Sequence, residues 1–296
     1  MTIWKESFAD KLFNTVAVIL LVLLAVITIY PFYYLLVYSF NDPIDAMRGD
    51  IYLWPRVFST LAYKVVWMTN NIGHALLVSL SRTVLGTVLT VFFTSMLSYV
   101  LSRQYLIWRT FFNRLFIITM YVSAGLIPWY LTLKTYGFTN NFLVYLMPGL
   151  VGVFYMILIR VYMEGLPAEL SESAEMDGAN DFTVFIRIIL PICTPVLAVV
   201  CVFGAVGQWN SWFDAAVFNN SSKGLEPLQL ILINMLKKAT IRNSSDVQMT
   251  NSATMVLTPE AMRAAVTIIA TVPIICVYPF FQKYFAQGIM LGSVKG

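Results

Sequence analysis

The sequence predicts an all-α membrane protein, and three observations lead to that prediction. Hydrophobic residues make up 59% of the 296 residues and charged residues only 11%, whereas a soluble domain carries about a quarter charged residues. Six segments are apolar over about 20 residues, the length that crosses the hydrocarbon core of a bilayer. Backbone in that core must form its own hydrogen bonds, so these segments are expected to be helices. We therefore expect a polytopic protein with six transmembrane helices in one domain, 1–296.

The expected spans follow one another along the whole chain. The first continues from a short charged N-terminus that lacks the small-residue cleavage site of a signal peptide, so we expect it to be retained. Prolines lie inside or near several spans, where they indicate either helix-packing geometry or the hinge points of a gate. The spans cover residues 14–39, 72–101, 111–135, 141–163, 190–218 and 262–285.

Two long connections join spans on one side of the predicted topology. Segment 41–71 has few apolar runs, and segment 219–258 contains a stretch, 227–238, whose apolar spacing predicts a short surface helix. Lysine and arginine counts on the two sides are equal, so the positive-inside rule does not decide the orientation. With the polar loop 164–191 placed inside, both termini are cytoplasmic and 219–258 lies outside.

Ionisable and thiol residues exclude several kinds of site. The net charge of +4 is spread out, whereas nucleic-acid binding needs a clustered basic face. His74 is the single histidine, which leaves no histidine cluster for a metal. The phosphate-binding motif G-x-x-x-x-G-K-[ST] is absent. We expect no catalytic residue, no metal site, no cofactor and no nucleic-acid partner. The cysteines lie in apolar segments without metal-ligand spacing, namely Cys193, Cys201 and Cys276.

The loop 164–191 is the most specific polar feature of the chain. Three of its glutamates lie three residues apart and so share one stripe of a helix, namely Glu169, Glu172 and Glu175. Gly178 can take the left-handed conformation that ends a helix, and Asn180 and Asp181 are suitable N-caps for a second one. An amphipathic connector lying on the membrane is one interpretation. The acidic stripe disfavours it, because inner-leaflet lipid is also negative, and favours a protein partner with a complementary groove.

The same loop has a characteristic spacing. It reads Glu172-Ser-Ala-Glu-Met-Asp177-Gly178, then nine residues, then Ile188-Ile-Leu-Pro191. This resembles the coupling loop of permease subunits in ATP-binding-cassette (ABC) importers, with Ser173 in place of an alanine. Four further stretches are similar to the carbohydrate, maltose-permease-like branch, within which the chain looks closest to the second permease of complex-oligosaccharide and alginate-type importers. These stretches are Gly125–Leu131, Met147–Gly149, Gly207–Phe213 and Gln282–Gly296.

The resemblance implies a type I ABC importer permease fold in the bacterial cytoplasmic membrane. It also implies four kinds of protein and ligand partner beside membrane lipid: a second homologous permease that completes a heterodimeric pore, two ATPase subunits that bind ATP and magnesium, an extracytoplasmic solute-binding protein, and an oligosaccharide. Segment 219–258 would approach the binding protein, and the tail Lys295-Gly296 would reach the ATPases. The residues implied in ATPase coupling are Glu172, Ser173, Ala174, Asp177, Gly178, Ile188, Leu190 and Pro191.

Polar and aromatic residues within the spans are candidates for a substrate path, since polar groups are expensive there. Aromatic faces beside amides suit a sugar, whose ring has apolar faces and whose hydroxyls bond to donors and acceptors. The other interpretation is structural, because Trp belongs at membrane interfaces and amides bond neighbouring helices. Arg82 could meet a substrate carboxylate or pair with an acid. The candidates are Arg82, Gln208, Trp209, Asn210, Trp212 and Asp214.

We expect a permease subunit of a binding-protein-dependent importer that carries oligosaccharides, acidic alginate-like ones among them. A permease for a non-sugar solute is the nearest alternative. A polytopic membrane enzyme is a more distant one, since it would need paired carboxylates or a nucleophile with an orienting base at matching depth. Asp214 has no evident acidic partner within a span, and His74 has no evident orienting partner.

Overall fold

The computed structural model describes residues 8–69, 71–244 and 258–293, and this part of the chain contains helices and no strand. The all-α prediction is therefore confirmed. Contacts divide the chain into two compact units, which are described separately below. Unit 1 comprises residues 1–70 and 235–272, and unit 2 comprises residues 71–234 and 273–296. Helices α13 (Leu228–Ser244) and α14 (Pro259–Ser293) each contribute to both units.

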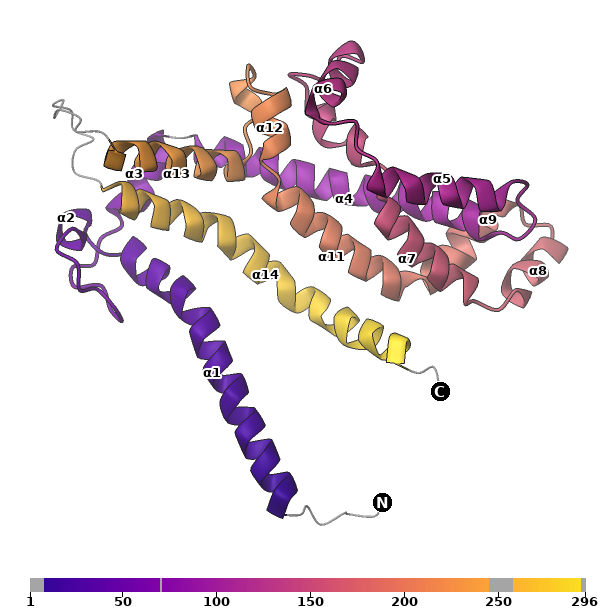
Figure 1. Cartoon of the computed structure of the whole chain (residues 1–296), viewed down its shortest axis with the longest axis horizontal. Helices are drawn as coiled ribbons and strands as arrows, with labels where there is room; N and C mark the ends of the chain where they lie inside the picture. The colour runs from indigo at the N-terminus through magenta and orange to yellow at the C-terminus, as the bar shows by residue number, and fades with distance from the viewer. Residues whose placement is uncertain (1–7, 70, 245–257, 294–296) are drawn as a thin grey trace. The chain divides into compact units, whose positions relative to one another are not determined.

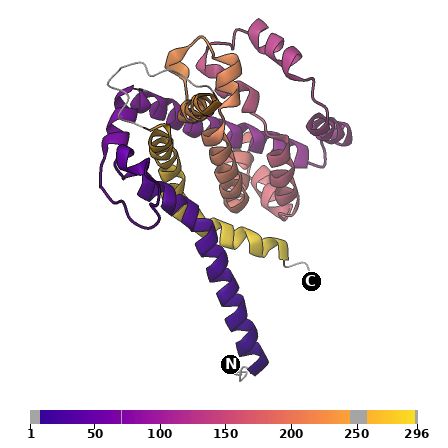
Figure 2. The ribbon, with the colours of Figure 1, turned by 60° about the vertical axis from the view of Figure 1, so that its left-hand side comes forward.

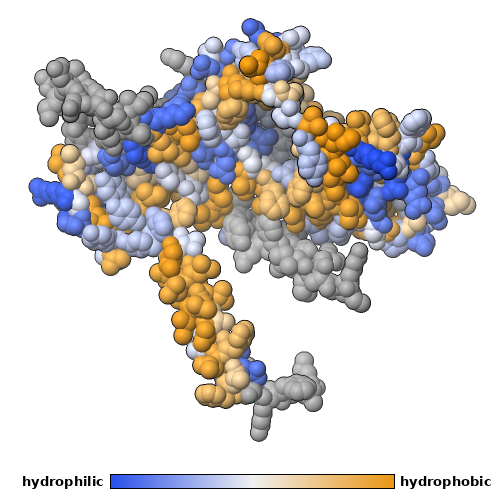
Figure 3. Space-filling model, in the orientation of Figure 1, coloured by the Kyte–Doolittle hydropathy of each residue, from blue (hydrophilic) through white to orange (hydrophobic). Residues whose placement is uncertain are grey.

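Unit 1 begins with α1 (Phe8–Ser39), a helix whose surface is almost entirely apolar (Figures 1 and 3). None of its most apolar window is buried within the chain, which is the expected state of a helix that faces lipid. The short helices α2 (Pro43–Ala46) and α3 (Leu61–Thr69) follow. The buried Asn41, just before α2, accepts a hydrogen bond from the Val57 amide at 3.1 Å and so closes the loop between α1 and α3.

Unit 2 is built around α4 (Ile72–Ser102), which runs unbroken over 31 residues. Helices α7 (Val153–Glu164) and α11 (Thr194–Asn210) pack along it, and both views show the three side by side (Figures 1 and 2). The other helical segments are α5 (Arg109–Tyr121), α6 (Leu126–Thr135), η1 (Phe142–Tyr145), η2 (Met147–Gly149), α8 (Glu169–Met176), α9 (Asp181–Val184), η3 (Phe185–Ile189), α10 (Leu190–Ile192), α12 (Phe213–Phe218) and η4 (Lys223–Leu225).

Hydroxyl groups on one face of α4 bond the irregular backbone before α7. The Thr90 hydroxyl donates to the Gly149 carbonyl at 2.6 Å, and the Thr94 hydroxyl accepts from the Gly152 amide at 3.1 Å. A non-helical stretch at membrane depth leaves backbone groups unpaired, and each unpaired group is costly away from water. The small polar side chains of α4 supply the missing partners and let the helices approach closely.

Two apolar clusters lie toward opposite ends of α4. One surrounds Phe185 and Ile159 beside the C-terminal half of α4, and the other surrounds Tyr145 and Phe218 beside its N-terminal half. Each cluster fixes a group of polar residues described below. Unit 2 therefore offers two candidate sites joined by one continuous helix.

The expected count of six spans is not confirmed. Among the described residues, two helices are long and apolar enough to cross a membrane, α1 and α4, and three bent pairs of helices raise the count to at most five. The bends are large: 116° between α5 and α6, 43° between 142–149 and α7, and 82° between 181–192 and α11. The sixth expected span, 262–285, falls on α14, which contains two prolines.

Local chemistry explains where the expected spans break. Span 111–135 is interrupted at 122–125, where Gly125 adopts a φ of +83° that favours glycine. Span 190–218 overlaps a helical run that starts at Asp181, bends at Cys193 and ends at Asn210. Ser211 is extended, and the rest of the span forms α12. Of segment 219–258, the predicted helix is present as α13, with Leu228, Leu230 and Ile231 buried, whereas 245–257 and the tail 295–296 lie outside the described residues.

Candidate functional site

The polar loop folds as helix, glycine turn and helix. Helix α8 (Glu169–Met176) is followed by a turn at Gly178, whose φ is +83°. The Gly178 amide donates to the Glu175 carbonyl at 3.0 Å and the Ala179 amide to the Ala174 carbonyl at 2.9 Å, the paired bonds of a Schellman turn. Asn180 then caps α9 by accepting from the Thr183 amide at 2.8 Å. The short helices predicted on either side of Gly178 are present.

The candidate coupling residues divide between an exposed face and a packed one. Glu172, Ser173, Asp177 and Gly178 are exposed, and the Ser173 hydroxyl donates to the Glu169 carbonyl of the turn before it at 2.8 Å. The serine therefore fits the helix without disturbing it. Three candidates pack against the apolar cluster around Phe185, namely Ala174, Ile188 and Leu190. Pro191 lies exposed just before the bend at Cys193.

Met176 on this surface was not among the predicted site residues. Its side chain is 87% exposed at the last turn of α8, beside the acidic residues. Hydrophilic side chains gather at this end of unit 2 (Figure 3), so an exposed methionine there is an apolar contact point with no packing role in the chain itself. Large apolar side chains at the centre of a polar surface are frequent anchors of protein interfaces.

The connection between α4 and α5 touches the same loop. Arg103 lies 3.9 Å from the Glu175 carboxylate, the Tyr105 hydroxyl donates to Asp181 at 2.8 Å, and Arg109 forms an ion pair with Glu164. Partial burial and the hydrogen bond to the Asp181 carboxylate raise the pKa of Tyr105 to about 12. The phenol is therefore protonated, and able to donate, throughout the physiological pH range.

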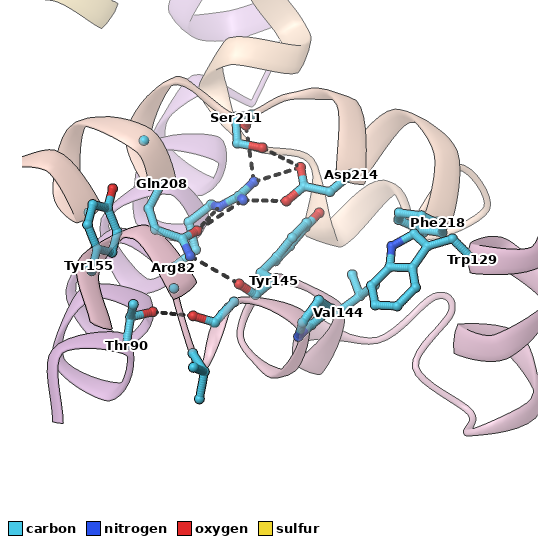
Figure 4. A pocket seen from close by; sticks show the side chains of 16 residues that line it. Arg82, Thr90, Trp129, Val144, Tyr145, Tyr155, Gln208, Ser211, Asp214 and Phe218 are labelled. Carbon is cyan, nitrogen blue, oxygen red and sulfur yellow. Dashed lines mark hydrogen bonds and ion pairs between the residues drawn. The ribbon is translucent and has the colours of Figure 1, made fainter. Parts of the chain in front are cut away.

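The second candidate site is a cavity of about 390 Å³ beside the N-terminal half of α4 (Figure 4). Its lining includes three predicted substrate-path residues, Arg82, Gln208 and Asp214. Aromatic side chains line other parts of it, and Trp129 and Tyr155 lie on different sides of the polar group in the figure. Most of its surface is apolar, with a small number of convergent polar groups, which is the usual character of a small-molecule site.

Arg82 is fully engaged within the chain. Only 1% of its side chain is exposed, and its guanidinium contacts both Asp214 carboxylate oxygens at 2.5 and 3.2 Å. It also donates to the Ser211 carbonyl at 3.1 Å and lies 4.3 Å from the centroid of the Tyr145 ring. A buried arginine needs this number of partners to offset its lost hydration. The geometry favours the pairing role over the substrate-carboxylate role considered from the sequence.

Gln208 completes the polar group. Its carbonyl accepts from Arg82 at 3.2 Å, and its amide donates to the Tyr145 carbonyl at 3.3 Å. A Cβ atom at Gly86 of α4 would lie 2.8 Å from the Gln208 side chain, so the glycine makes room for it. The Gln208 side chain therefore links its own helix, α11, to Arg82 of α4 and to Tyr145 of η1.

Three predicted substrate-path residues lie outside the cavity lining. Trp209 is buried, Trp212 packs against the apolar cluster around Phe218, and Asn210 bonds to the Val206 carbonyl at 3.0 Å and to Gln229 at 3.2 Å. The aromatic residues that do line the cavity were not singled out. Trp129 lies in the motif Gly125–Leu131, and Tyr145 lies just before Met147–Gly149. Nothing in the sequence distinguished these two residues from aromatic residues that only pack.

Comparisons with known proteins agree on one group of relatives. The chain is 37% identical over 291 residues to Protein LplC of Bacillus subtilis (strain 168), covering 97% of this chain and 96% of LplC. It is 33% identical over 288 residues to the polygalacturonan/rhamnogalacturonan transport system permease protein YtcP of the same organism, covering 97% and 99% of the two chains.

A solved structure supports the same grouping. The chain matches a crystal structure of a bacterial ABC transporter involved in the import of the acidic polysaccharide alginate, with a TM-score of 0.84 and 28% identity. The match covers 95% of this chain and 99% of that chain. No protein-family model matches the sequence.

Proposed function

The chain belongs to the permease subunits of carbohydrate ABC importers, and on that premise we propose that segment 164–191 couples it to partner ATPases. The chain is an oligosaccharide transport permease of the inner membrane, not an enzyme. The observation that carries the coupling proposal is the geometry around Gly178. The short acidic helix α8 ends in a glycine turn, and its exposed residues, Met176 among them, do not pack against the rest of the chain.

The proposed partners follow from the permease family and from this surface. A second permease would complete the pore, two ATPases would bind ATP and magnesium, and an extracytoplasmic binding protein would deliver the sugar. Transport is then a two-state equilibrium between inward-facing and outward-facing forms, biased by ligands that bind one form better. Six spans and two cytoplasmic termini remain part of the proposal, with segment 219–258 facing the binding protein.

We infer that the substrate is an oligosaccharide that includes uronic acid units. Two relatives support this: YtcP is named for polygalacturonan and rhamnogalacturonan, and the similar structure belongs to an importer of alginate. In the cavity, Trp129 and Tyr155 offer aromatic faces to the apolar faces of a sugar ring. Because Asp214 already matches the charge of Arg82, substrate carboxylates would be bound by groups other than this arginine.

The coupling proposal is tested by purification of the tagged chain in mild detergent, with quantitative mass spectrometry of the proteins that accompany it. Gly178→Pro should abolish recovery of the ATPase, because proline requires a φ near −65° where the turn needs +83°. The partner permease should still be recovered, since the substitution lies in a surface turn.

A matched control exists in the same chain. Gly137 also has a positive φ, +73°, and ends α6 with the same pair of bonds, from Gly137 to Lys134 at 3.0 Å and from Phe138 to Leu133 at 2.9 Å. Gly137→Pro disturbs an equivalent turn away from segment 164–191, so it should leave ATPase recovery unchanged. Equal ATPase recovery with Gly178→Pro and wild type would refute the coupling proposal.

A further inference from the structure

The connection between α4 and α5, together with Arg109 at the start of α5, contacts segment 164–191 at three separated places. Arg109 pairs with Glu164 before α8, Arg103 approaches Glu175 within α8, and Tyr105 bonds to Asp181 at the start of α9. The three contacts therefore bracket the Gly178 turn. A single contact would allow the loop to pivot, whereas three contacts distributed along it fix its position relative to the end of α4.

The basic side chains in these contacts are anchored on α4 itself. The Arg103 guanidinium stacks over the Tyr99 ring, 4.3 Å from its centroid, and bonds to its hydroxyl. Arg109 donates from Nε to the Leu101 carbonyl at 3.0 Å. An arginine held by a second contact loses little further freedom when it binds a carboxylate. Each contact thus acts as a short, oriented link between the helix end and the loop.

The backbone of the connection is also held in an uncommon conformation. Trp108, immediately before Arg109, has a φ of +65° although its side chain is bulky. A non-glycine residue is found there when its surroundings determine the conformation, and such residues gather at functional segments. A cavity of about 450 Å³ separates parts of the connection from α8, so polar links, more than close packing, determine their separation.

These contacts are unsuited to a mainly stabilising role. Arg109 and Glu164 are about one-third exposed, and Glu175 is 44% exposed. Ion pairs at such exposure contribute little to stability. These ion pairs instead link the movements of the two segments, because a displaced glutamate of segment 164–191 displaces the arginine bound to it. The same α4 carries Arg82 in the second candidate site, so α4 physically connects the loop with the cavity.

We propose that Arg103, Tyr105 and Arg109 form a clamp that transmits movement of the coupling helix α8 to α4 and so to the cavity. They are positioning residues: they act through α8, and the proposal rests on the coupling function proposed above. Helix α4 and segment 164–191 would then move together. They would take one arrangement when the ATPases are open and another when the ATPases are closed.

The test uses the complete importer, purified with its partner subunits in lipid nanodiscs. The native cysteines are replaced by alanine, and a fluorophore is attached to Val151→Cys, at the rim of the cavity. ATP with magnesium is titrated, and the fluorescence change is recorded. Tyr105→Phe, Arg109→Gln and Glu164→Gln should raise the ATP concentration for half-maximal response by about 2- to 30-fold, the range for residues that carry coupling between sites. ATPase recovery should not change.

Two comparisons separate transmission from a general structural effect. Arg109→Gln/Glu164→Gln should shift the response no further than Glu164→Gln alone, because that substitution already removes the link to Arg109 together with the ion pair to Arg160 at 3.6 Å. Arg114→Gln and Tyr121→Phe, exposed positions on α5 outside these contacts, should match the wild type. The clamp is refuted by unshifted responses in the clamp variants, by additive shifts in the double variant, or by a wild-type cavity label that does not respond to bound ATP. Failure of the wild-type chain to recover an ATPase would instead refute the coupling function.

Discussion

At the scale of single residues, Arg82 shows why a charge inside a spanning segment is not automatically a substrate contact. A guanidinium has five donors in a fixed plane, and here Asp214, Gln208 and the Ser211 carbonyl accept from it. With 1% of the side chain exposed, it has little access to anything else. Arg82 therefore determines the shape of the cavity by holding α4 against α11 and α12, while aromatic neighbours present the surface that a sugar would meet.

This arrangement predicts a large loss of stability when the acidic partner is neutralised. Asp214→Asn should lower the free energy of unfolding by about 2 to 3 kcal/mol, somewhat less than for a fully buried pair because Asp214 is partly exposed. The cost arises because Arg82 stays charged in a site without a matching charge. Unfolding by SDS in mixed micelles measures it.

Asp50→Asn is the control for that measurement, since Asp50 is an exposed residue that also carries a carboxylate. It should change the free energy of unfolding by less than about 0.5 kcal/mol, as is usual for exposed substitutions. Equal changes in the free energy of unfolding for Asp214→Asn and Asp50→Asn would show that the ion pair with Arg82 does not stabilise the fold.

At the scale of elements, α4 combines an unbroken helix with hydroxyl groups that satisfy its interrupted neighbour. The irregular backbone from the end of η2 to the start of α7 would otherwise present unpaired groups inside the unit. Thr90 and Thr94 bond to this backbone, and both are buried. The sequence alone does not show that a helical threonine bonds to a neighbouring segment. The role of these two hydroxyls is apparent only from the position of the backbone before α7.

The hydroxyl of Thr90 can be tested by an isosteric substitution. Thr90→Val should lower the free energy of unfolding by about 0.5 to 1.5 kcal/mol, because it leaves the Gly149 carbonyl without its donor. Thr87→Val on the same helix is the matched control. The Thr87 hydroxyl is buried without a hydrogen-bond partner among the described residues, so removing it should be neutral or stabilising. Equal losses at the two positions would contradict the assignment.

At the scale of the whole molecule, sequence periodicity predicted helices well and their continuity poorly. The turn at Gly178 and the cap at Asn180 follow from local chemistry within a few residues, and both are present. The break at 122–125 is also local, since these residues are exposed and Gly125 takes a φ of +83°. Hydropathy averaged along a whole span does not register a break of this length. The expected count of six spans is therefore not confirmed by the described residues, which give at most five.

The candidate sites show the same division between local and long-range information. The spacing around Glu172 and Gly178 marks the proposed coupling loop because its residues are neighbours in the sequence. The cavity brings Arg82 together with residues such as Gln208, which is 126 positions away along the chain. The sequence offered the polar members as candidates because such groups are rare in spans, but it could not tell which aromatic residues face them.

Orientation in the membrane is not decided by the sequence, because lysine and arginine counts on the two sides are equal. The structure of unit 2 makes the orientation testable. Helix α4 has the connection 103–108 at one end, whereas at the other His74 bonds to the Gly224 carbonyl at 2.6 Å, close to Ser221. The two ends should therefore lie on opposite membrane faces. In a background with the native cysteines replaced, Ser221→Cys should react with a membrane-impermeant thiol reagent on intact cells. Gln104→Cys should react only after permeabilisation, because it adjoins segment 164–191, which we propose faces the ATPases. The reverse pattern would invert the proposed orientation and contradict ATPase binding at α8.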